Sequence, residues 1–416
     1  MSQFTGMEAL KKISESGVYE DYTTRTMFHR EKKYKYDPYR IFLGWDTKGR
    51  PVHLPVRTSK IILIAGKRGA GKTFLLRALM NRLYLSGHIP IILTDIKGEY
   101  KSSKKPVQKK FAHLLYEGEE PTAFPIRSYH PAFLEKYSPE PGDIPCQLSL
   151  DKITRKDMET ILGYDIRGIS PKKKELLMRV FEKVEGGDIF TFKEFIRSIW
   201  IDEDAGDKTK ESVINSVRTA IKQGILGDEY SDFDWTDDVV EEYIPVLNLK
   251  GFKEHYGYTS AFISVVAKQV IESKKRGLIE RGKKIFYFID EAHRWLGALN
   301  ESSAKKTLIN IMREARSAGV SLVCATQTLN GLDEAVRKQT SFILFPSRTD
   351  APTVMGIMKE AGLYERYGKF ADDLNKNLQM ISKMGGHVWV LVDMDKRDIR
   401  VIKKLGGPLS FHQEEI

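Results

Sequence analysis

A glycine-rich segment near residue 70 has the residue types and spacing that bind a triphosphate. Residues 66–73 fit the pattern G-x-x-x-x-G-K-[ST], with an apolar run before them and a helix-like pattern after them. The glycines let the backbone curl so that N–H groups face phosphate oxygens, while Lys72 reaches the β- and γ-phosphates and Thr73 offers a hydroxyl to Mg²⁺. We therefore expect ATP and Mg²⁺ as cofactors. The predicted cofactor-binding residues are Gly66, Lys67, Arg68, Gly69, Ala70, Gly71, Lys72, Thr73 and Phe74.

A second segment supplies the carboxylates that such a site requires. Residues 284–289 are mainly apolar and predict a buried strand, and Asp290 and Glu291 follow directly. Asp290 is predicted to hold Mg²⁺ together with Thr73, directly or through water. Glu291 is predicted to be the general base that polarises the attacking water. An ordinary helix cap by Asp290 is the structural alternative.

A third apolar run, residues 319–326, ends in Thr326 and Gln327. In a parallel sheet the carboxyl ends of the strands lie on one edge, where ligands bind. Gln327 is therefore predicted to lie near the γ-phosphate and to belong to the catalytic set with Lys72 and Glu291. A polar pair in a loop is the structural alternative.

The elements around these motifs predict an α/β fold with a central, mostly parallel sheet. Short apolar runs typical of buried strands occur at residues 61–65, 89–93, 244–249, 285–289, 320–326 and 342–345, and helical patterns lie between them. Residues 154–227 have helical periodicity and predict a helical insertion. Residues 387–393 and 398–402 predict a terminal β-hairpin. The expected organisation is an N-terminal arm (1–50), a first core part (51–145), a mostly helical insertion (146–240) and a second core part (241–416).

The composition of the chain indicates the kind of partner and excludes a disulfide-based fold. The 416 residues contain 67 Lys and Arg against 56 Asp and Glu, a net charge of +11 that suits a polyanion partner. Cys146 and Cys324 are too few for a disulfide scaffold. Because neither a secretory signal nor an apolar run long enough to span a membrane is visible, a soluble cytoplasmic protein is expected. Aromatic and basic residues alternate over 19–39, which predicts either a nucleic-acid or subunit contact or a solvated arm.

Several strings in this order resemble the HerA/FtsK superfamily of RecA-like P-loop ATPases, most closely its archaeal HerA-like branch. The strings, besides the phosphate loop, are I-F-L-G at 41–44, D-I-K-G-E-Y at 95–100, I-P-V-L-N-L-K-G at 244–251, I-D-E-A-H at 289–293, R-E-A-R-S-A-G at 313–319, A-T-Q at 325–327 and G-G-H-V-W-V at 385–390. That branch usually carries an N-terminal β-barrel, of which at most a remnant is expected here.

The resemblance implies an ATP-driven DNA translocase or helicase that works as a ring, in that family usually a hexamer. ATP would lie at subunit interfaces, and an arginine from the neighbour would complete the site. The candidates are Arg316, Arg313 and Arg348. DNA would pass through a basic pore and be held by its phosphates, and residues 97–110, 172–174 and 274–281 are the basic stretches that could line it. A nuclease is the partner expected with the barrel; without it, packaging or transfer of virus or plasmid DNA is the alternative.

Two further alternatives stay open at this point. A two-lobed DEAH-type helicase shares the phosphate loop and the D-E-A-H string that ends at His293, but no arginine-rich Q-x-x-G-R-x-G-R string follows. An ATP-dependent assembly switch would need the phosphate loop but not a base beside the metal ligand. Stimulation of ATP hydrolysis by DNA distinguishes a motor from a switch.

Overall fold

The computed structural model describes residues 36–411, except for residues 47, 133–140, 164–169, 231–234, 253–254, 281, 348, 350, 362–387 and 404. The side chains of residues 315, 316, 351 and 355 also fall outside the description. Most of the predicted N-terminal arm therefore lies outside the described residues. No helix in the described ranges is both long enough and apolar enough to cross a bilayer.

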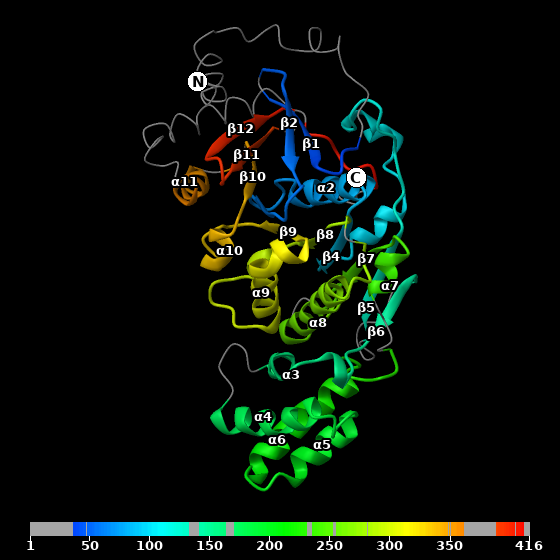
Figure 1. Cartoon of the computed structure of the whole chain (residues 1–416), viewed down its shortest axis with the longest axis vertical. Coiled ribbons are helices and arrows are strands. Elements are labelled where there is room, and N and C mark those ends of the chain that lie inside the picture. Colours follow the sequence, from blue (N-terminus) through cyan, green and yellow to red (C-terminus); the bar gives the residue numbers. More distant parts are fainter. Residues whose placement is uncertain are drawn as a thin grey trace.

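A ten-stranded sheet forms the centre of the described structure, in the order β12-β11-β10-β3-β9-β8-β4-β7-β5-β6 (Figure 1). The strands from β10 to β6 are parallel, and β11 and β12 add an antiparallel edge. This arrangement confirms the predicted α/β class with a mostly parallel sheet. The strands are β3 (Ile61–Ala65), β4 (Ile89–Asp95), β5 (Ile126–Pro131), β6 (Asp143–Cys146), β7 (Ile244–Asn248), β8 (Ile285–Ile289), β9 (Val320–Thr326), β10 (Phe342–Pro346), β11 (Trp389–Asp393) and β12 (Asp398–Ile402).

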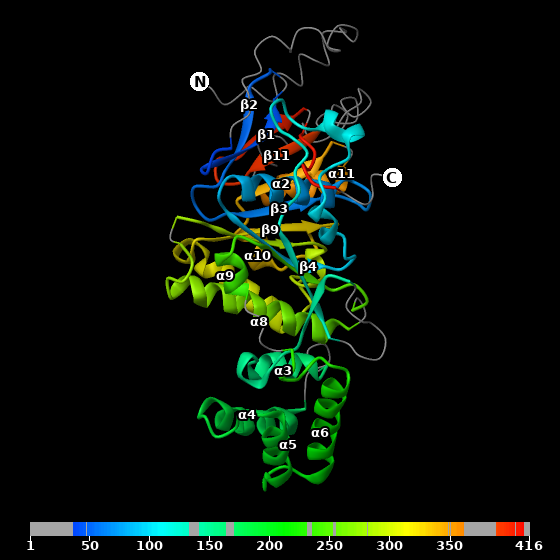
Figure 2. The same cartoon turned by 90° about the vertical axis from the view of Figure 1, so that its right-hand side faces the viewer.

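Residues of the central strands alternate between two hydrophobic cores, one on each face of the sheet. In β3, Ile61 and Leu63 join the core shared with the long helices, whereas Ile62 and Ile64 join the core on the opposite face. This alternation follows from the period of two in a strand. One face carries α8 (Tyr256–Lys275) and α9 (Ser303–Ala318), and the other carries α2 (Lys72–Leu85) (Figures 1 and 2). The shorter helices are α7 (Trp235–Val240), α10 (Glu334–Lys338) and α11 (Ala351–Glu360).

A small antiparallel hairpin lies over α2. It consists of β1 (Arg40–Trp45) and β2 (Pro51–Pro55), joined around Asp46, whose carboxylate accepts hydrogen bonds from the Lys48 and Arg50 backbone N–H groups. The two β-like pieces predicted on either side of this turn are thus observed as a pair.

The predicted helical segments between 154 and 227 form α3 (Arg155–Ile161), α4 (Pro171–Glu185), α5 (Phe192–Ile201) and α6 (Asp207–Lys222). Their starts are specified locally: Thr154 and Thr191 each make a capping box, and Ser170 caps α4 with proline at its first position. Helices α4 to α6 form a bundle below α8, on the side away from the sheet, and α3 lies between them and α8 (Figures 1 and 2).

The last described segment, residues 405–411, crosses α2 and is here called the C-terminal strap. Three polar side chains of α2 are buried beneath it, Arg77, Asn81 and Arg82. The Asn81 carbonyl oxygen accepts hydrogen bonds from the Leu409 and Ser410 backbone N–H groups. Two 3-10 helices, η1 (Tyr100–Lys104) and η2 (Lys109–Leu114), lie beside the strap, and the Val107 N–H donates to the Leu409 carbonyl between them.

Candidate active site

The phosphate loop connects β3 to α2, as its pattern predicted, and its backbone conformation depends on glycine. Gly69 and Gly71 have φ values of 75° and 83°, in the left-handed region that other residues rarely adopt. Gly66 is needed for space instead, because a Cβ there would lie 3.1 Å from the Ala70 Cβ and 3.2 Å from Pro346 at the end of β10. The loop is thereby curled ahead of the first turn of α2, whose N–H groups form an anion site.

Lys72, the first residue of α2, is bound to the loop that precedes it. Its ammonium donates to the Gly66 carbonyl at 2.8 Å and to the Lys67 carbonyl at 3.0 Å, and the residue is buried. A protonated lysine has three donors. The side chain is therefore held over the loop, where an ammonium can meet phosphate oxygens.

Asp290 lies beside Thr73, although 217 positions separate them in the chain. The Thr73 hydroxyl donates to the Asp290 carboxylate at 3.3 Å. Burial raises the pKa of Asp290 to about 6, although the Glu291 backbone N–H, which donates at 2.8 Å, favours the charged form. A buried carboxylate of this kind is costly unless a cation lies beside it. The structure thus brings together the two residues predicted to contact the metal.

This pair fits Mg²⁺. A hydroxyl and a carboxylate are the hard oxygen ligands that the ion prefers, and Mg²⁺ completes its octahedron with water and substrate phosphates rather than with many protein groups. Thr73 and Asp290, both half-buried beside the phosphate loop, would hold the ion. Their metal role remains a prediction.

Glu291 follows Asp290 in a strained turn and faces two polar neighbours. Its φ of 49° is unusual for a residue with a side chain. The Gln327 amide donates to both of its carboxylate oxygens, at 3.0 and 3.3 Å, and His293 Nδ1 lies 3.4 Å from one of them. Burial lowers the pKa of His293, which favours the neutral ring. The Gln327 amide therefore orients the carboxylate, as expected for a base that positions water, whereas His293 Nδ1 makes no hydrogen bond with a described residue.

Sequence reasoning placed Gln327 near the γ-phosphate but not in contact with Glu291. This contact follows from the strand order, because β9, which ends just before Gln327, lies between β3 and β8. Thr94 was not predicted at all: its hydroxyl donates to the Asp290 backbone carbonyl at 3.0 Å and so fixes the turn. Its position at the end of a buried strand was the available signal.

The loop after β4, within the D-I-K-G-E-Y string at 95–100, is ordered by one of its own side chains. The Asp95 carboxylate accepts from the Glu99 and Tyr100 backbone N–H groups at 2.9 and 3.0 Å. Burial nevertheless raises its pKa to about 6.

Of the candidate arginines, the structure describes the side chain of Arg313, which is not at this edge of the sheet. Helix α9 runs back from the carboxyl edge, where Glu291 lies, to the start of β9, and the Gly319 carbonyl after it accepts from the N–H of Ile285, the first residue of β8. Arg313 is exposed in the second half of α9, and so belongs to the opposite edge. Arg316 follows in the same helix, but its side chain is outside the described residues, as is Arg348 altogether.

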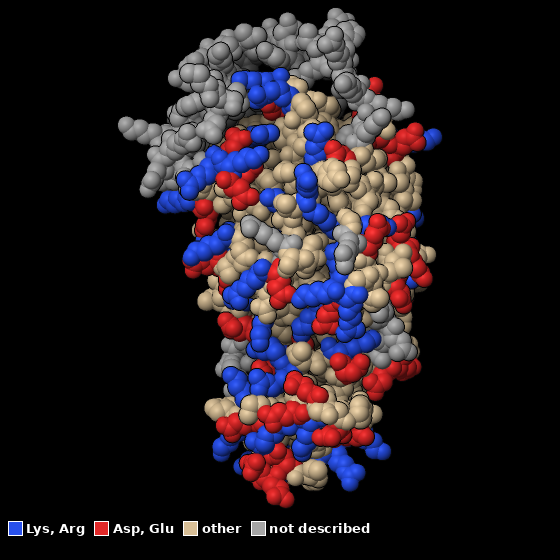
Figure 3. All heavy atoms as spheres, in the orientation of Figure 1, with Lys and Arg blue, Asp and Glu red and all other residues tan. Residues whose placement is uncertain are grey.

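The predicted basic stretches differ in whether their lysines are exposed or already bonded to other residues. Lys104, Lys105, Lys109 and Lys110 are exposed on and around η1 and η2, and Lys172 and Lys174 are exposed at the start of α4. At the end of α8, in contrast, Lys274 donates to the Glu280 and Lys283 carbonyls and Lys275 pairs with Glu314. Basic and acidic side chains are mixed over the face that carries α8 and α9 (Figure 3). The η1–η2 region is therefore the strongest candidate for a phosphate-backbone contact.

Two curated proteins are similar to this chain. The DNA double-strand break repair helicase HerA of Sulfolobus acidocaldarius is 26% identical over 300 residues, 68% of this chain and 53% of that protein. HerA of Sulfurisphaera tokodaii is 25% identical over 51% of this chain and 47% of its own length. The chain thus spans about half the length of these curated relatives.

Solved structures share the fold. VirB4 of Thermoanaerobacter pseudethanolicus has a TM-score of 0.57 at 16% identity, over 90% of this chain and 97% of that one. The plasmid coupling protein TrwB in complex with ADP and Mg²⁺ has a TM-score of 0.53 at 14% identity, over 93% of each chain. The model of the family "Helicase HerA, central domain" matches residues 41–323. The chain therefore belongs to the HerA family of RecA-like P-loop ATPases.

Proposed function

We propose that this chain is an ATP hydrolase that uses ATP to move DNA. The observation that supports the proposal is the 3.3 Å hydrogen bond from Thr73 to Asp290, because it joins the start of α2, after the phosphate loop, to the acidic strand end. A base candidate, Glu291, lies next to the metal ligand and is oriented by Gln327. A pure nucleotide switch does not need this third component.

Each residue has a separate task in this proposal. The loop amides and Lys72 bind and orient the phosphates, Thr73 and Asp290 hold Mg²⁺, and Glu291 accepts a proton from the attacking water. Bound Mg²⁺ supplies neutralisation of the charge that develops on the phosphates. Gln327 keeps the Glu291 carboxylate in place, so that the proton is accepted at a defined oxygen.

A ring of subunits would complete the site. Because α9 carries Arg313 to the sheet edge opposite the phosphate loop, this arginine can approach a triphosphate only if it belongs to a neighbouring chain. An arginine supplied in this way stabilises charge on the transferred phosphoryl group and is worth about 10³–10⁵ in rate. We propose a ring, with six subunits as the expected number, through which DNA passes.

The proposed substrate is DNA, contacted mainly through its phosphates. The net charge of +11 and the exposed lysines of the η1–η2 region support a polyanion. The identity to helicases named for double-strand break repair favours that process, with a nuclease as the partner. Packaging or transfer of virus or plasmid DNA is the second candidate, because it would use the same site.

Hydrolysis of ATP with and without duplex DNA tests the proposal. The wild-type rate should rise severalfold with DNA, and Lys72→Ala should abolish both rates, whereas Lys208→Ala, an exposed lysine on α6, should not. Electron microscopy with ATP and DNA should show closed rings around DNA. A slow rate that DNA does not change, from particles that are not rings, would support an assembly switch instead.

A further inference from the structure

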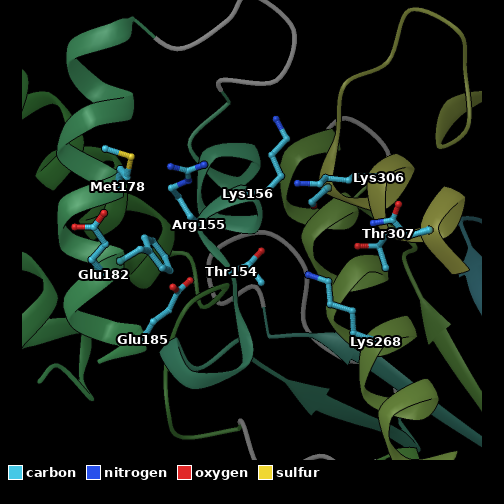
Figure 4. A pocket seen from close by; sticks show the side chains of 12 residues that line it. Thr154, Arg155, Lys156, Met178, Glu182, Glu185, Lys268, Lys306 and Thr307 are labelled. Atoms are coloured by element: carbon cyan, nitrogen blue, oxygen red, sulfur yellow. The ribbon is translucent and has the colours of Figure 1, made fainter. Parts of the chain in front are cut away.

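A cleft separates the helical bundle from the core, far from the phosphate loop in the chain and in the fold. Its volume is about 440 Å³, within the range of small-molecule sites. One wall is α4, and the other is formed by α3, α8 and α9 (Figure 4). None of the residues assigned to ATP or Mg²⁺ lines it.

The wall formed by α3, α8 and α9 carries an excess of positive charge. Its cations are Arg155, Lys156, Lys268 and Lys306. The first two share one carboxylate, Glu159, at 3.5 and 3.6 Å, and Lys268 pairs with Asp157 at 2.9 Å. Lys306 is exposed and forms no ion pair with any residue in the described ranges. Four cations therefore face two carboxylates, which leaves this wall with a net charge of +2.

The α4 wall has the opposite character. Glu182 and Glu185 are exposed there, and neither pairs with a cation among the residues that the structure describes. Met178, 42% exposed, and Phe181 lie on the same helix and give the wall an apolar part. Figure 4 shows Met178, Glu182 and Glu185 on α4, on the opposite side of the opening from Lys268 and Lys306. A ligand that satisfies both walls must be anionic at one end and carry hydrogen-bond donors at the other.

A buried hydroxyl adds an independent sign of a ligand. Ser303, the first residue of α9, lines the cleft with 1% of its surface exposed, and its Oγ has no hydrogen-bond partner among the described residues. Such orphaned polar atoms are rare in folded proteins. The end of the helix is not itself the site, since its first N–H groups already donate to Thr160 Oγ1 and Ser260 Oγ.

From this geometry we infer that the cleft binds a nucleotide unit, separate from the ATP site. The phosphate contacts Lys306, Arg155 and the Ser303 hydroxyl. The base lies against Met178, and its exocyclic amino group donates to Glu182 or Glu185. Adenine and cytosine have such an amino group, whereas thymine has none. The unit is either a free nucleotide or one residue of a DNA strand.

Occupation of the cleft has a route to the ATP site. The helix that supplies Ser303 and Lys306 begins after the loop that carries Glu291, and its far end carries Arg313. A ligand that contacts its first two turns therefore acts on the element between the proposed base and the proposed neighbour-facing arginine. DNA bound in the cleft would in this way affect the rate of ATP hydrolysis.

The test uses full-length Lys72→Ala protein, so that the phosphate loop does not contribute to binding. Fluorescence anisotropy measures the binding of oligo-dA, oligo-dC and oligo-dT of equal length, with dAMP as competitor. Hydrogen exchange measures the protection of backbone amides in α3 and α9. We expect oligo-dA and oligo-dC to bind several-fold more tightly than oligo-dT and to protect both helices. Added Lys306→Glu should weaken binding about tenfold, whereas Lys208→Glu, outside the cleft and outside the predicted basic stretches, should not. The double change Glu182→Gln, Glu185→Gln should remove the preference over oligo-dT.

The outcomes distinguish a free nucleotide from a DNA strand as the ligand, and they distinguish the cleft proposal from the proposed motor function. Protection of α3 and α9 by dAMP alone assigns the cleft to free nucleotides, and protection by oligonucleotides only assigns it to a strand. Equal binding of oligo-dT and oligo-dA, equal effects of Lys306→Glu and Lys208→Glu, or no protection with any probe overturns the inference. In the Lys72-containing chain, Lys306→Glu should keep its DNA-independent ATP hydrolysis, so that failure at the cleft is distinguishable from failure of the proposed motor.

Discussion

Replacing Asp290 by asparagine should stabilise the protein without metal and remove its response to Mg²⁺-nucleotide. The side chain is nearly isosteric, and its oxygen can still accept from the Glu291 N–H or the Thr73 hydroxyl. What changes is the charge. Burial disfavours the carboxylate form, and asparagine has no such form.

The size of the effect follows from the pKa of Asp290, which is about 6 in the folded protein against an ordinary value of 3.8. A shift of roughly 2 units at about 1.4 kcal/mol per unit gives about 3 kcal/mol as an upper estimate. Because the folded state holds its proton more tightly, the wild type loses stability as pH rises from about 4 to about 6. The advantage of Asp290→Asn should therefore grow over this range and stay constant above it.

Urea unfolding at pH 4 and pH 8 in EDTA measures this advantage. Asp395→Asn serves as the control, because Asp395 is 60% exposed on its side chain and should give no comparable gain. Adding Mg²⁺ and ADP should stabilise the wild type and the control but not Asp290→Asn. If Asp290→Asn is less stable than the wild type at pH 8, the argument from the buried charge is refuted. If it keeps the full response to Mg²⁺ and ADP, the metal role is refuted.

Three further changes test other parts of the structure. Glu291→Gln should retain ATP binding but lower hydrolysis at least about 10²-fold, measured as trapped nucleotide and released phosphate; unchanged turnover would remove Glu291 from the base role. Arg82→Ala should cost about 3–5 kcal/mol in urea unfolding, because it leaves the buried Glu119 carboxylate without its 2.7 Å partner; a cost below about 1 kcal/mol would contradict this. Gly406→Ala should cost about 1–3 kcal/mol, since its Cβ would lie 2.5 Å from the Tyr116 ring, whereas Gly206→Ala meets nothing within 4 Å and is the control; equal costs would argue against close packing.

Much of the sheet could be predicted because its central strands are buried on both faces. Continuous apolar runs such as Ile285–Ile289 and Val320–Thr326 have the observed bounds. The edge strand β6 and its neighbour β5 were missed, because each contains proline and lies among glycines and charges. Strand order was not accessible either: β3 and β4 follow each other in the chain but lie apart, with β9 and β8 between them.

In the candidate site too, continuous motifs could be predicted from the sequence, whereas contacts between residues far apart in the chain could not. The phosphate loop is one continuous string, so its members could be named from spacing alone. The contact of Gln327 with Glu291 depends on which strands are neighbours, and the bond from Thr94 to the Asp290 carbonyl depends on a register between strands far apart in sequence. The cleft between α4 and α9 could not be predicted, because it exists only through the packing of one bundle on another.

The C-terminal strap has a consequence for the timing of synthesis. Phe411, whose carbonyl accepts from Arg77, lies 334 positions after that arginine. The helix that follows the phosphate loop is made early, but Asn81 and Arg77 find their strap partners only when residues 405–411 have left the ribosome. In a nascent chain these buried polar groups of α2 therefore stay without their strap partners until translation has passed this segment, so the packing over α2 is completed late.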